Sequence, residues 1–199
     1  MIRILSTCAV ALSLSLAATA APVVGQLAPQ FTAVDTDGKS HALSEFKGKT
    51  VVLEWTNDGC PYVQKHYGSG NMQKVQKDLT AAGAVWLSVI SSAPGKQGYV
   101  SGEEANQLTA SRGAKPTAVL LDPKGVVGRA YEAQTTPHMF VIDKAGVLRY
   151  MGAIDDQPTT DRDTIAGARN YVREAFAAVS SGGKVALAAT DPYGCSVKY

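Results

Sequence analysis

Cys60 is the residue of this chain best placed to do chemistry, because it lies between an apolar run and a segment typical of a helix. Residues 50–53 predict a buried strand, and Pro61 suits the first turn of a helix. At such a strand-to-helix corner, unpaired N–H groups and the positive end of the helix dipole favour a thiolate, the form that attacks disulfides and peroxides. The corner is expected to be exposed. The alternative is a small buried thiol without reactivity.

Cys195 is the second cysteine that bears on this chemistry, and its position near the end of the chain leaves three roles open. It could resolve an intermediate formed on Cys60, form a permanent disulfide, or pair with another chain. A bond to Cys60 would close a loop of about 135 residues, worth ~4–5 kcal/mol in the chain-entropy model. Sequence distance is therefore no objection, and the requirement is that the two Cα atoms come within ~7 Å.

Residues 1–20 have the pattern of a secretory signal peptide, with Arg3, an apolar run and a small-residue exit. The sequence Ala18-Thr19-Ala20 predicts cleavage before Ala21, which would deliver a periplasmic or secreted protein without a membrane span in its mature chain. An uncleaved anchor is the alternative. In an oxidising compartment Cys60 and Cys195 could pair or work together.

The remaining chain predicts one domain over residues 21–181, followed by a tail over residues 182–199 that carries Cys195. The full sequence has 19 basic and 17 acidic residues and a net charge of +2. This balance gives no reason to expect a nucleic-acid or anionic-membrane partner. We expect no cofactor and no resident metal.

Strand and helix patterns alternate along the domain. Two short strands at residues 31–34 and 40–43 are joined by the turn residues Asp37-Gly38. Further strands are expected at residues 50–55, 84–90 and 117–121, with a second hairpin at 139–143 and 147–152. Helices are expected at residues 61–82 with a break near 68–70, at 103–111 and at 159–180, and residues 125–131 predict a short helix or an irregular turn. This order favours a central mixed sheet with helices on both faces.

Four segments together resemble the redoxin branch of the thioredoxin fold, which includes the alkyl hydroperoxide reductase and thiol-specific antioxidant family. They are residues 25–31, residues 37–49, the Cys60-Pro61 corner and Thr135-Thr136-Pro137. The box Cys60-Pro61-Tyr62-Val63 is similar to that of exported bacterial thioredoxin-family proteins that keep only the first cysteine. The resemblance implies an α/β, thioredoxin-like fold: a central mixed β-sheet flanked by helices, with an N-terminal β-hairpin extension.

The resemblance also implies a site. Pro137 would be a cis proline facing Cys60, with the backbone of Thr136 turned toward the sulfur, where an extended substrate could pair with it. Two departures from the family patterns limit which functional residues can be carried over to this chain. Val63 stands where dithiol thioredoxins have their second cysteine, and Asn57 stands where peroxiredoxins typically have a threonine. An intramolecular Cys-x-x-Cys disulfide is therefore impossible, and the threonine of a typical peroxiredoxin mechanism is absent from its position.

The leading hypothesis is an exported thiol oxidoreductase in which Cys60 attacks a peroxide or a protein disulfide. Cys195 or an external thiol reductant would resolve the product, and Asn57, Pro61, Thr136 and Pro137 would support the site. One alternative is a Cu(I)-binding module that uses both cysteines with His66 or His138. Another is a redox-inactive binding domain of the same fold.

Two further polar residues, Glu54 and His66, each allow more than one role at the site. Glu54, within the apolar strand, is either a buried acid that could take the thiol proton through water or a surface acid on an edge strand. His66 is expected to be a surface or supporting residue rather than a general base, because it lies six residues after Cys60 on the same helix.

Overall fold

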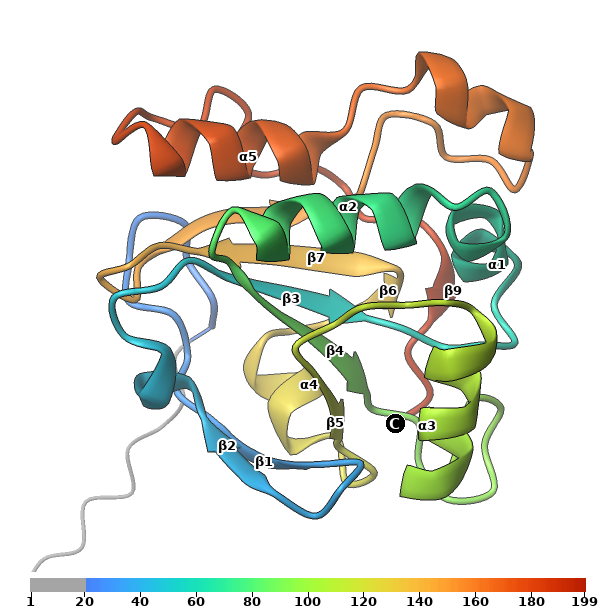
Figure 1. Ribbon diagram of the computed structural model, residues 1–199. Coiled ribbons are helices and arrows are strands. Elements are labelled where there is room, and N and C mark those ends of the chain that lie inside the picture. Colours follow the sequence, from blue (N-terminus) through green and yellow to red (C-terminus); the bar gives the residue numbers. More distant parts are fainter. Residues whose placement is uncertain (1–20) are drawn as a thin grey trace, which may run out of the picture.

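The computed structural model describes residues 21–199, and the predicted signal peptide lies outside the described residues. Within this range one mixed sheet has the strand order β2-β1-β5-β4-β3-β7-β8 (Figure 1). Its strands are β1 (Thr32–Asp35), β2 (Ser40–Ala42), β3 (Val51–Trp55), β4 (Val85–Ile90), β5 (Ala118–Leu121), β7 (His138–Ile142) and β8 (Leu148–Gly152). A separate two-stranded sheet pairs β6 (Thr135–Thr136) with β9 (Cys195–Ser196).

Helices cover both faces of this sheet (Figure 1). They are α1 (Pro61–Gly68), α2 (Asn71–Ala81), α3 (Gly102–Ser111), α4 (Val126–Ala130) and α5 (Tyr171–Ser180), with short 3₁₀ helices η1 (Leu43–Phe46) and η2 (Arg162–Gly167). One apolar core contains residues of α1, α2 and α5, and the other contains residues of α4 and η1. The fold is the predicted thioredoxin-like arrangement with an N-terminal hairpin, β1–β2.

The interior strand β3 contributes to both cores because successive side chains of a strand point to opposite faces. Trp55 packs in the α4 core, with ring centroids 5.5 Å from Tyr131 and 5.2 Å from Phe140. Val52 packs in the opposite core, beneath α1, α2 and α5. The strand is buried along its whole length and runs directly toward Cys60. It therefore gives the cysteine corner a rigid base.

The predicted break near residues 68–70 is confirmed: α1 ends at Gly68, and Gly70 has a φ of +75° before α2 begins. The single helix expected at residues 159–180 is wrong, because η2 and α5 are separate. Ala168 is extended, the Asn170 side chain caps α5 by accepting from Arg173 N at 2.9 Å, and Tyr171 N donates to Ile154 O at 3.0 Å. This bond to the segment after β8 diverts the backbone out of a helix, which helical periodicity could not predict.

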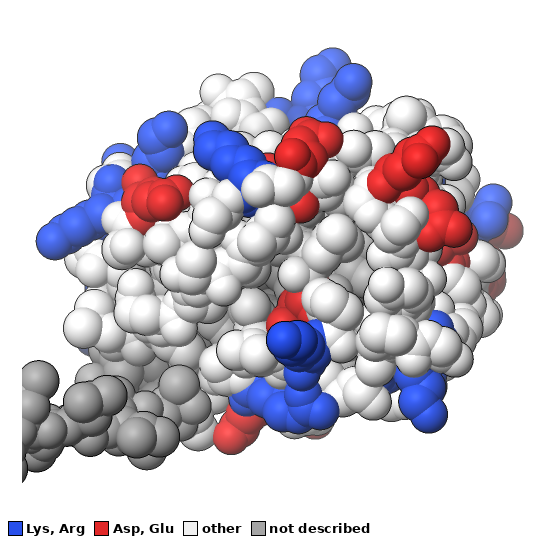
Figure 2. Space-filling view, turned by 90° about the horizontal axis from the view of Figure 1, so that it is seen from below, with Lys and Arg blue, Asp and Glu red and all other residues white. Residues whose placement is uncertain are grey.

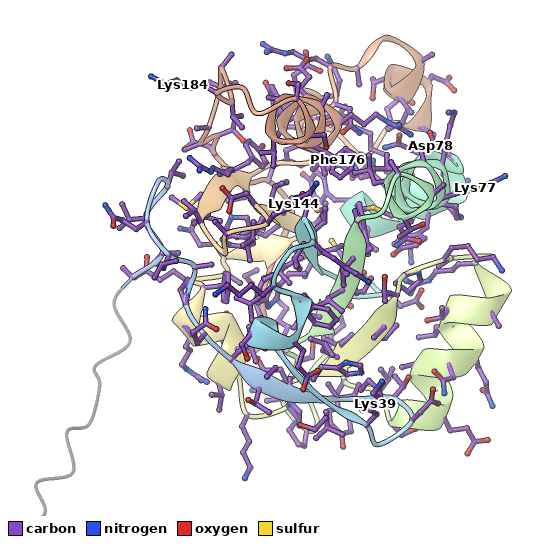
Figure 3. All side chains as sticks on the ribbon, turned by 60° about the vertical axis from the view of Figure 1, so that its left-hand side comes forward. Lys39, Lys77, Asp78, Lys144, Phe176 and Lys184 are labelled. Carbon is purple, nitrogen blue, oxygen red and sulfur yellow. The ribbon has the colours of Figure 1, made fainter. Side chains whose placement is uncertain are left out.

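Helix α5 lies against α2 in the layer above the sheet. The guanidinium of Arg173 pairs with Asp78 of α2 at 2.8 Å, and Phe176 belongs to the core between α5 and the sheet. Figure 3 shows Phe176 and Asp78 in this layer. After α5 the chain turns back toward the site.

The C-terminal tail is docked along the molecule rather than free. Ala189 forms a bridge with Met151 of β8, and the Thr190 hydroxyl lies 2.7 Å from the Tyr150 hydroxyl. Farther on, Ala93 N donates to Lys198 O at 2.7 Å, and the Tyr199 hydroxyl donates to Ala133 O at 2.8 Å. In Figure 1 this red segment passes beside α1 and ends near α3. Between these anchors lies Cys195.

Candidate functional site

Cys60 occupies the N-cap position of α1, five residues after the end of β3. Its thiol donates to the carbonyl oxygen of Thr136 at 3.0 Å. The Thr136-Pro137 peptide is cis, as the resemblance implied. Pro61 takes the first position of α1, where its missing N–H costs no intrahelical hydrogen bond. Residues 60, 61, 136 and 137 therefore meet at one place.

The expectation of an exposed corner is wrong, because Cys60 is 0% exposed. The C-terminal tail covers the sulfur. Cys195 of β9 pairs antiparallel with Thr136 of β6, the residue whose carbonyl oxygen accepts from the Cys60 thiol. The tail thus occupies the backbone position at Thr136 that we expected an extended substrate to take. Sequence spacing could not reveal this cover, since the pairing joins residues 59 positions apart.

The two thiols are electrostatically unequal. Burial raises the pKa of Cys60, but hydrogen bonds from the side chains of Cys195 and Thr136 and from backbone N–H groups outweigh it, and the pKa is lowered overall. Burial, with a smaller contribution from the neighbouring Cys60, raises the pKa of Cys195 to about 11. At neutral pH, Cys60 is therefore the better nucleophile and Cys195 remains a thiol.

This inequality predicts a pH dependence for Cys60. Its thiolate fraction rises with pH and is half-maximal below the pKa of an unperturbed cysteine, because the folded site favours the charged form. The rate of reaction with a small disulfide, measured between pH 5 and 10, is expected to reach half its plateau below that value. A half-point above it would contradict the stabilised thiolate.

Gly194 allows the tail to pass the cis-proline loop. Its φ is +143°, and a Cβ atom there would lie 2.1 Å from Thr136 O, which is far inside contact distance. Gly194→Ala is expected to displace the tail at a cost of about 1–3 kcal/mol, raising the rate at which Cys195 reacts with a thiol reagent roughly tenfold or more. Gly167→Ala is the matched control, because a Cβ there meets nothing within 4 Å. Equal rates in the two variants would contradict the close approach.

Asn57 shapes the corner without touching the sulfur. Its side chain accepts from Gly59 N at 3.0 Å and donates to Gln97 Oε1 at 3.1 Å. Its carbonyl oxygen accepts from Cys60 N at 3.1 Å. Asn57 therefore fixes the turn that presents Cys60, and the structure gives it no contact that would bind a peroxide.

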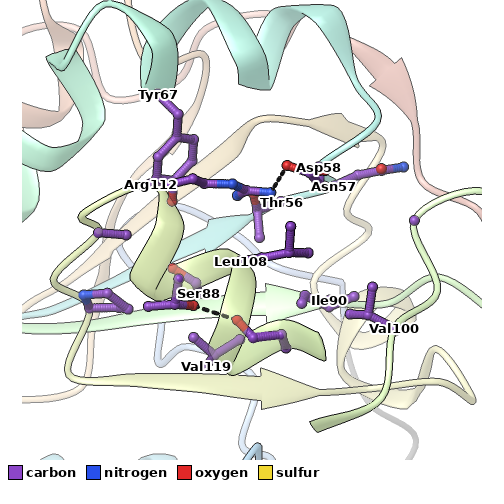
Figure 4. Close-up of a pocket in the computed structure, with 15 residues that line it drawn as sticks. Thr56, Asn57, Asp58, Tyr67, Ser88, Ile90, Val100, Leu108, Arg112 and Val119 are labelled. Carbon is purple, nitrogen blue, oxygen red and sulfur yellow. Dashed lines mark hydrogen bonds and ion pairs between the residues drawn. The ribbon is translucent and has the colours of Figure 1, made fainter. Parts of the chain in front are cut away.

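A small cavity lies beside this turn, between α3 and the sheet (Figure 4). Asp58 and Arg112 pair across it, and the guanidinium of Arg112 lies 4.7 Å from the ring centre of Tyr67. Its volume of about 30 Å³ leaves room for water rather than for a substrate. Thr56 lines this cavity, and Cys60 does not.

Glu54 was expected to be either a buried acid or a surface acid on an edge strand. It is buried, with 0% exposure. Four side chains donate to its carboxylate: Tyr67 at 2.8 Å, Gln76 at 3.1 Å, Trp86 at 2.8 Å and Ser88 at 3.0 Å. Burial raises the pKa of Glu54 although these four bonds oppose the rise. The network ties β3 to α1, α2 and β4, which gives Glu54 a structural role under the site.

His66 is fully buried, which excludes the surface position and leaves the supporting role of the two alternatives. Its Nδ1 lies 2.9 Å from Asn71 Nδ2 and its Nε2 lies 3.1 Å from the Tyr193 hydroxyl. His138, next to the cis proline, accepts from Gln134 N at 3.2 Å through Nδ1. Burial lowers the pKa of His66 to about 3 and that of His138 to about 4, so both rings are neutral at pH 7.

The Cu(I) alternative required a histidine beside the two thiols. Among residues 21–199, no group of three or more His, Cys, Asp or Glu side chains is arranged to hold a metal ion. Asn71 and Tyr193 engage both nitrogens of His66. The described site therefore offers two sulfur atoms and no third ligand of these types.

Charges of both signs are interspersed on the face seen from below in Figure 2. No helix in the described part of the chain combines the length and apolarity needed to cross a membrane. Cys60 is buried and Cys195 is partly buried, and both lie at the cis-proline loop.

Comparison with known proteins supports this assignment. The family model for the AhpC/TSA family matches residues 24–151, which include Cys60 and Pro137. The thiol-disulfide oxidoreductase ResA of Geobacillus kaustophilus is 27% identical over 136 residues, covering 65% of this chain and 68% of that protein. A crystal structure of a hypothetical protein from Sinorhizobium meliloti 1021 has a TM-score of 0.77 and 24% identity, over 89% of this chain and 94% of that one.

A putative thiol:disulfide interchange protein DsbE from Chlorobium tepidum has a TM-score of 0.53 and 25% identity, over 65% of this chain and 84% of that one. The fold and the cysteine at the cis-proline loop define a thiol oxidoreductase of thioredoxin fold. The chain belongs to the AhpC/TSA family. The S. meliloti likeness extends past residue 151 into the C-terminal part of the chain.

Proposed function

We propose that the protein carries out thiol–disulfide exchange through Cys60, with Cys195 as the resolving thiol. The Cys60 thiolate attacks one sulfur of a substrate disulfide, forms a mixed disulfide and releases the other substrate sulfur as a thiolate. Cys195 then loses its proton to solvent and attacks the Cys60 sulfur, which releases the second substrate thiolate. The substrate gains two electrons, and the protein is left with a Cys60–Cys195 disulfide that an external thiol reductant reduces.

The observation that carries this proposal is that Cys195 pairs with Thr136, whose carbonyl oxygen accepts from the Cys60 thiol at 3.0 Å. This arrangement supports a resolving role for Cys195, because a thiol that is already at the cis-proline loop needs little movement in the second step. The first step with a protein substrate does need movement, because β9 pairs with Thr136. We expect the tail to leave β6 while the substrate is bound and to return when Cys195 attacks.

Peroxide is the second candidate substrate, and the burial of Cys60 supports it, because a small molecule requires less displacement of the tail. The thiolate would attack one peroxide oxygen, giving a sulfenic acid and releasing water or an alcohol. Cys195 would then displace water from that sulfur and form the same disulfide. Peroxide reduction has less support than disulfide exchange, because Asn57 stands where peroxiredoxins typically have a threonine.

Stopped-flow mixing of the reduced protein with hydrogen peroxide and, separately, with a disulfide-bonded protein distinguishes the two substrates. We expect oxidation by the protein disulfide to be fast and oxidation by peroxide to be no faster than that of a free thiol. In both cases the product should be a monomer that migrates faster on a non-reducing gel and has lost both thiols. A covalent dimer would overturn the role of Cys195 as an intramolecular resolving thiol.

We also propose that the protein is exported and works in the periplasm or outside the cell, with residues 1–20 as its signal peptide. The charge, apolar run and small residues of this segment support export. N-terminal sequencing of protein isolated from its native host would test it, with Ala21 as the expected first residue. Retention of Met1 in the mature protein would contradict cleavage.

A further inference from the structure

Tyr193, two residues before Cys195, enters a buried polar cluster beside α1 that the exchange chemistry does not use. Its hydroxyl donates to Oδ1 of Asp155, and Nε2 of His66 lies 3.1 Å from the same hydroxyl. His66 and Asp155 are 0% and 1% exposed. The tail thus inserts a hydroxyl between two groups that are fully withdrawn from solvent.

The direction of each hydrogen bond in this cluster follows from its partners. The Asn71 amide nitrogen can only donate, so Nδ1 of His66 accepts from it and carries no proton. A neutral His66 therefore has its proton on Nε2 and donates it to the oxygen of Tyr193. The hydroxyl proton is left to donate to Asp155, as the geometry shows. One hydroxyl satisfies both the donor of His66 and an acceptor of Asp155.

The ring of Tyr193 is held by the same helix. Its centroid lies 5.7 Å from that of Tyr62 in an edge arrangement, and the Lys65 ammonium lies 5.7 Å from its centre. Tyr62, Lys65 and His66 all belong to α1, the helix that begins directly after Cys60. Tyr193 therefore ties the tail to the element that positions the nucleophile.

We propose that Tyr193 is a positioning residue that, with His66 and Asp155, holds the Cys195 thiol against Cys60. The inference rests on the proposed resolving role of Cys195. Gly194 alone separates Tyr193 from Cys195, and its approach to Thr136 O leaves the connecting backbone little room to adjust. Anchoring the hydroxyl of residue 193 consequently fixes where the sulfur of residue 195 lies.

The tail offers a matched control in Tyr199, four residues after Cys195. Its hydroxyl also makes a hydrogen bond, to Ala133 O at 2.8 Å, and its ring is covered by the guanidinium of Arg129 at 4.6 Å. These partners lie in and just after α4, away from α1. Tyr199→Phe therefore removes one tail hydroxyl without disturbing the cluster that contains His66.

The test compares Tyr193→Phe with Tyr199→Phe in the full chain carrying Cys8→Ser, so that Cys60 and Cys195 are the only thiols. Thiolate absorbance titration gives the pKa of Cys60, and equilibration in glutathione buffers gives the equilibrium constant of the Cys60–Cys195 disulfide. Tyr193→Phe is expected to raise the Cys60 pKa toward that of Cys195→Ala, which has no donor at position 195, and to lower the equilibrium constant roughly tenfold, as for a lost hydrogen bond to a charged partner. Tyr199→Phe should change both by less than about twofold.

Thermal unfolding measures what each tyrosine hydroxyl contributes to the stability of the fold, and both variants are expected to lower the Tm. The proposal is overturned if Tyr193→Phe leaves the Cys60 pKa and the equilibrium constant unchanged, or if Tyr199→Phe shifts them equally. Absence of any Cys60–Cys195 disulfide in the parent protein would refute the proposed resolving role instead. The pKa titration would then still decide whether Tyr193 positions Cys195.

Discussion

Cys60→Ser is expected to abolish reduction of a protein disulfide, with a loss of at least about a thousandfold, because it removes the nucleophile on which both steps depend. The serine hydroxyl has nearly the same shape and can still donate to Thr136 O, so the fold should be retained. The measurement is the initial rate with a disulfide-bonded protein and an external thiol reductant, alongside a far-UV spectrum.

Cys195→Ser provides the contrast to this result. The first step should survive, because Cys60 remains and the serine hydroxyl at position 195 can still donate a hydrogen bond to its thiolate. The second step should stop, and a mixed disulfide between Cys60 and the substrate should accumulate and be visible by mass spectrometry. Full turnover by Cys60→Ser would remove the chemistry assigned to the site, whereas full turnover by Cys195→Ser would show that an external thiol resolves it.

Glu54→Ala is expected to produce the largest loss of stability, about 3–5 kcal/mol in the free energy of unfolding. The change leaves four buried donors without their acceptor and also opens a cavity in the strand that supports the site. Glu45→Ala, at an exposed position, is the control and should stay within about 0.5 kcal/mol. Urea unfolding measures both. Similar midpoints in the two variants would contradict a structural role for the network.

Glu54→Gln gives the corresponding pH prediction. Burial raises the folded-state pKa of Glu54, so between the unfolded and folded values the unfolded chain has already released a proton that the folded chain keeps. The stability that Glu54 contributes in its protonated form is therefore present below its unfolded pKa and is lost as the pH rises through its folded pKa. Glutamine does not titrate, so the stability of the wild type relative to Glu54→Gln should fall as the pH rises above about 4.5. A flat difference would show that the pKa is not raised.

The strand-to-helix corner at Cys60 could be predicted from the sequence without the structure. A buried strand, a glycine and Cys60-Pro61 at the start of a helix form a local pattern, and local patterns follow from backbone geometry and from the period of apolar residues. The order of elements predicted the mixed α/β sheet. The cis bond before Pro137 came from the resemblance of whole segments to a family, since a proline alone would have favoured trans.

The tertiary structure alone decided that Cys60 is covered and what covers it. The pairing of β9 with β6 involves two residues on each side, which is too short to produce a periodic signal in the sequence. The cluster of His66, Asp155 and Tyr193 joins α1, the segment after β8 and the tail, and the first and last of these lie 127 residues apart. The same kind of distant contact, from Tyr171 N to Ile154 O, interrupted the expected helix at 159–180. Contacts of this range depend on the packing of the whole chain, because no local preference encodes which distant segment will supply the partner.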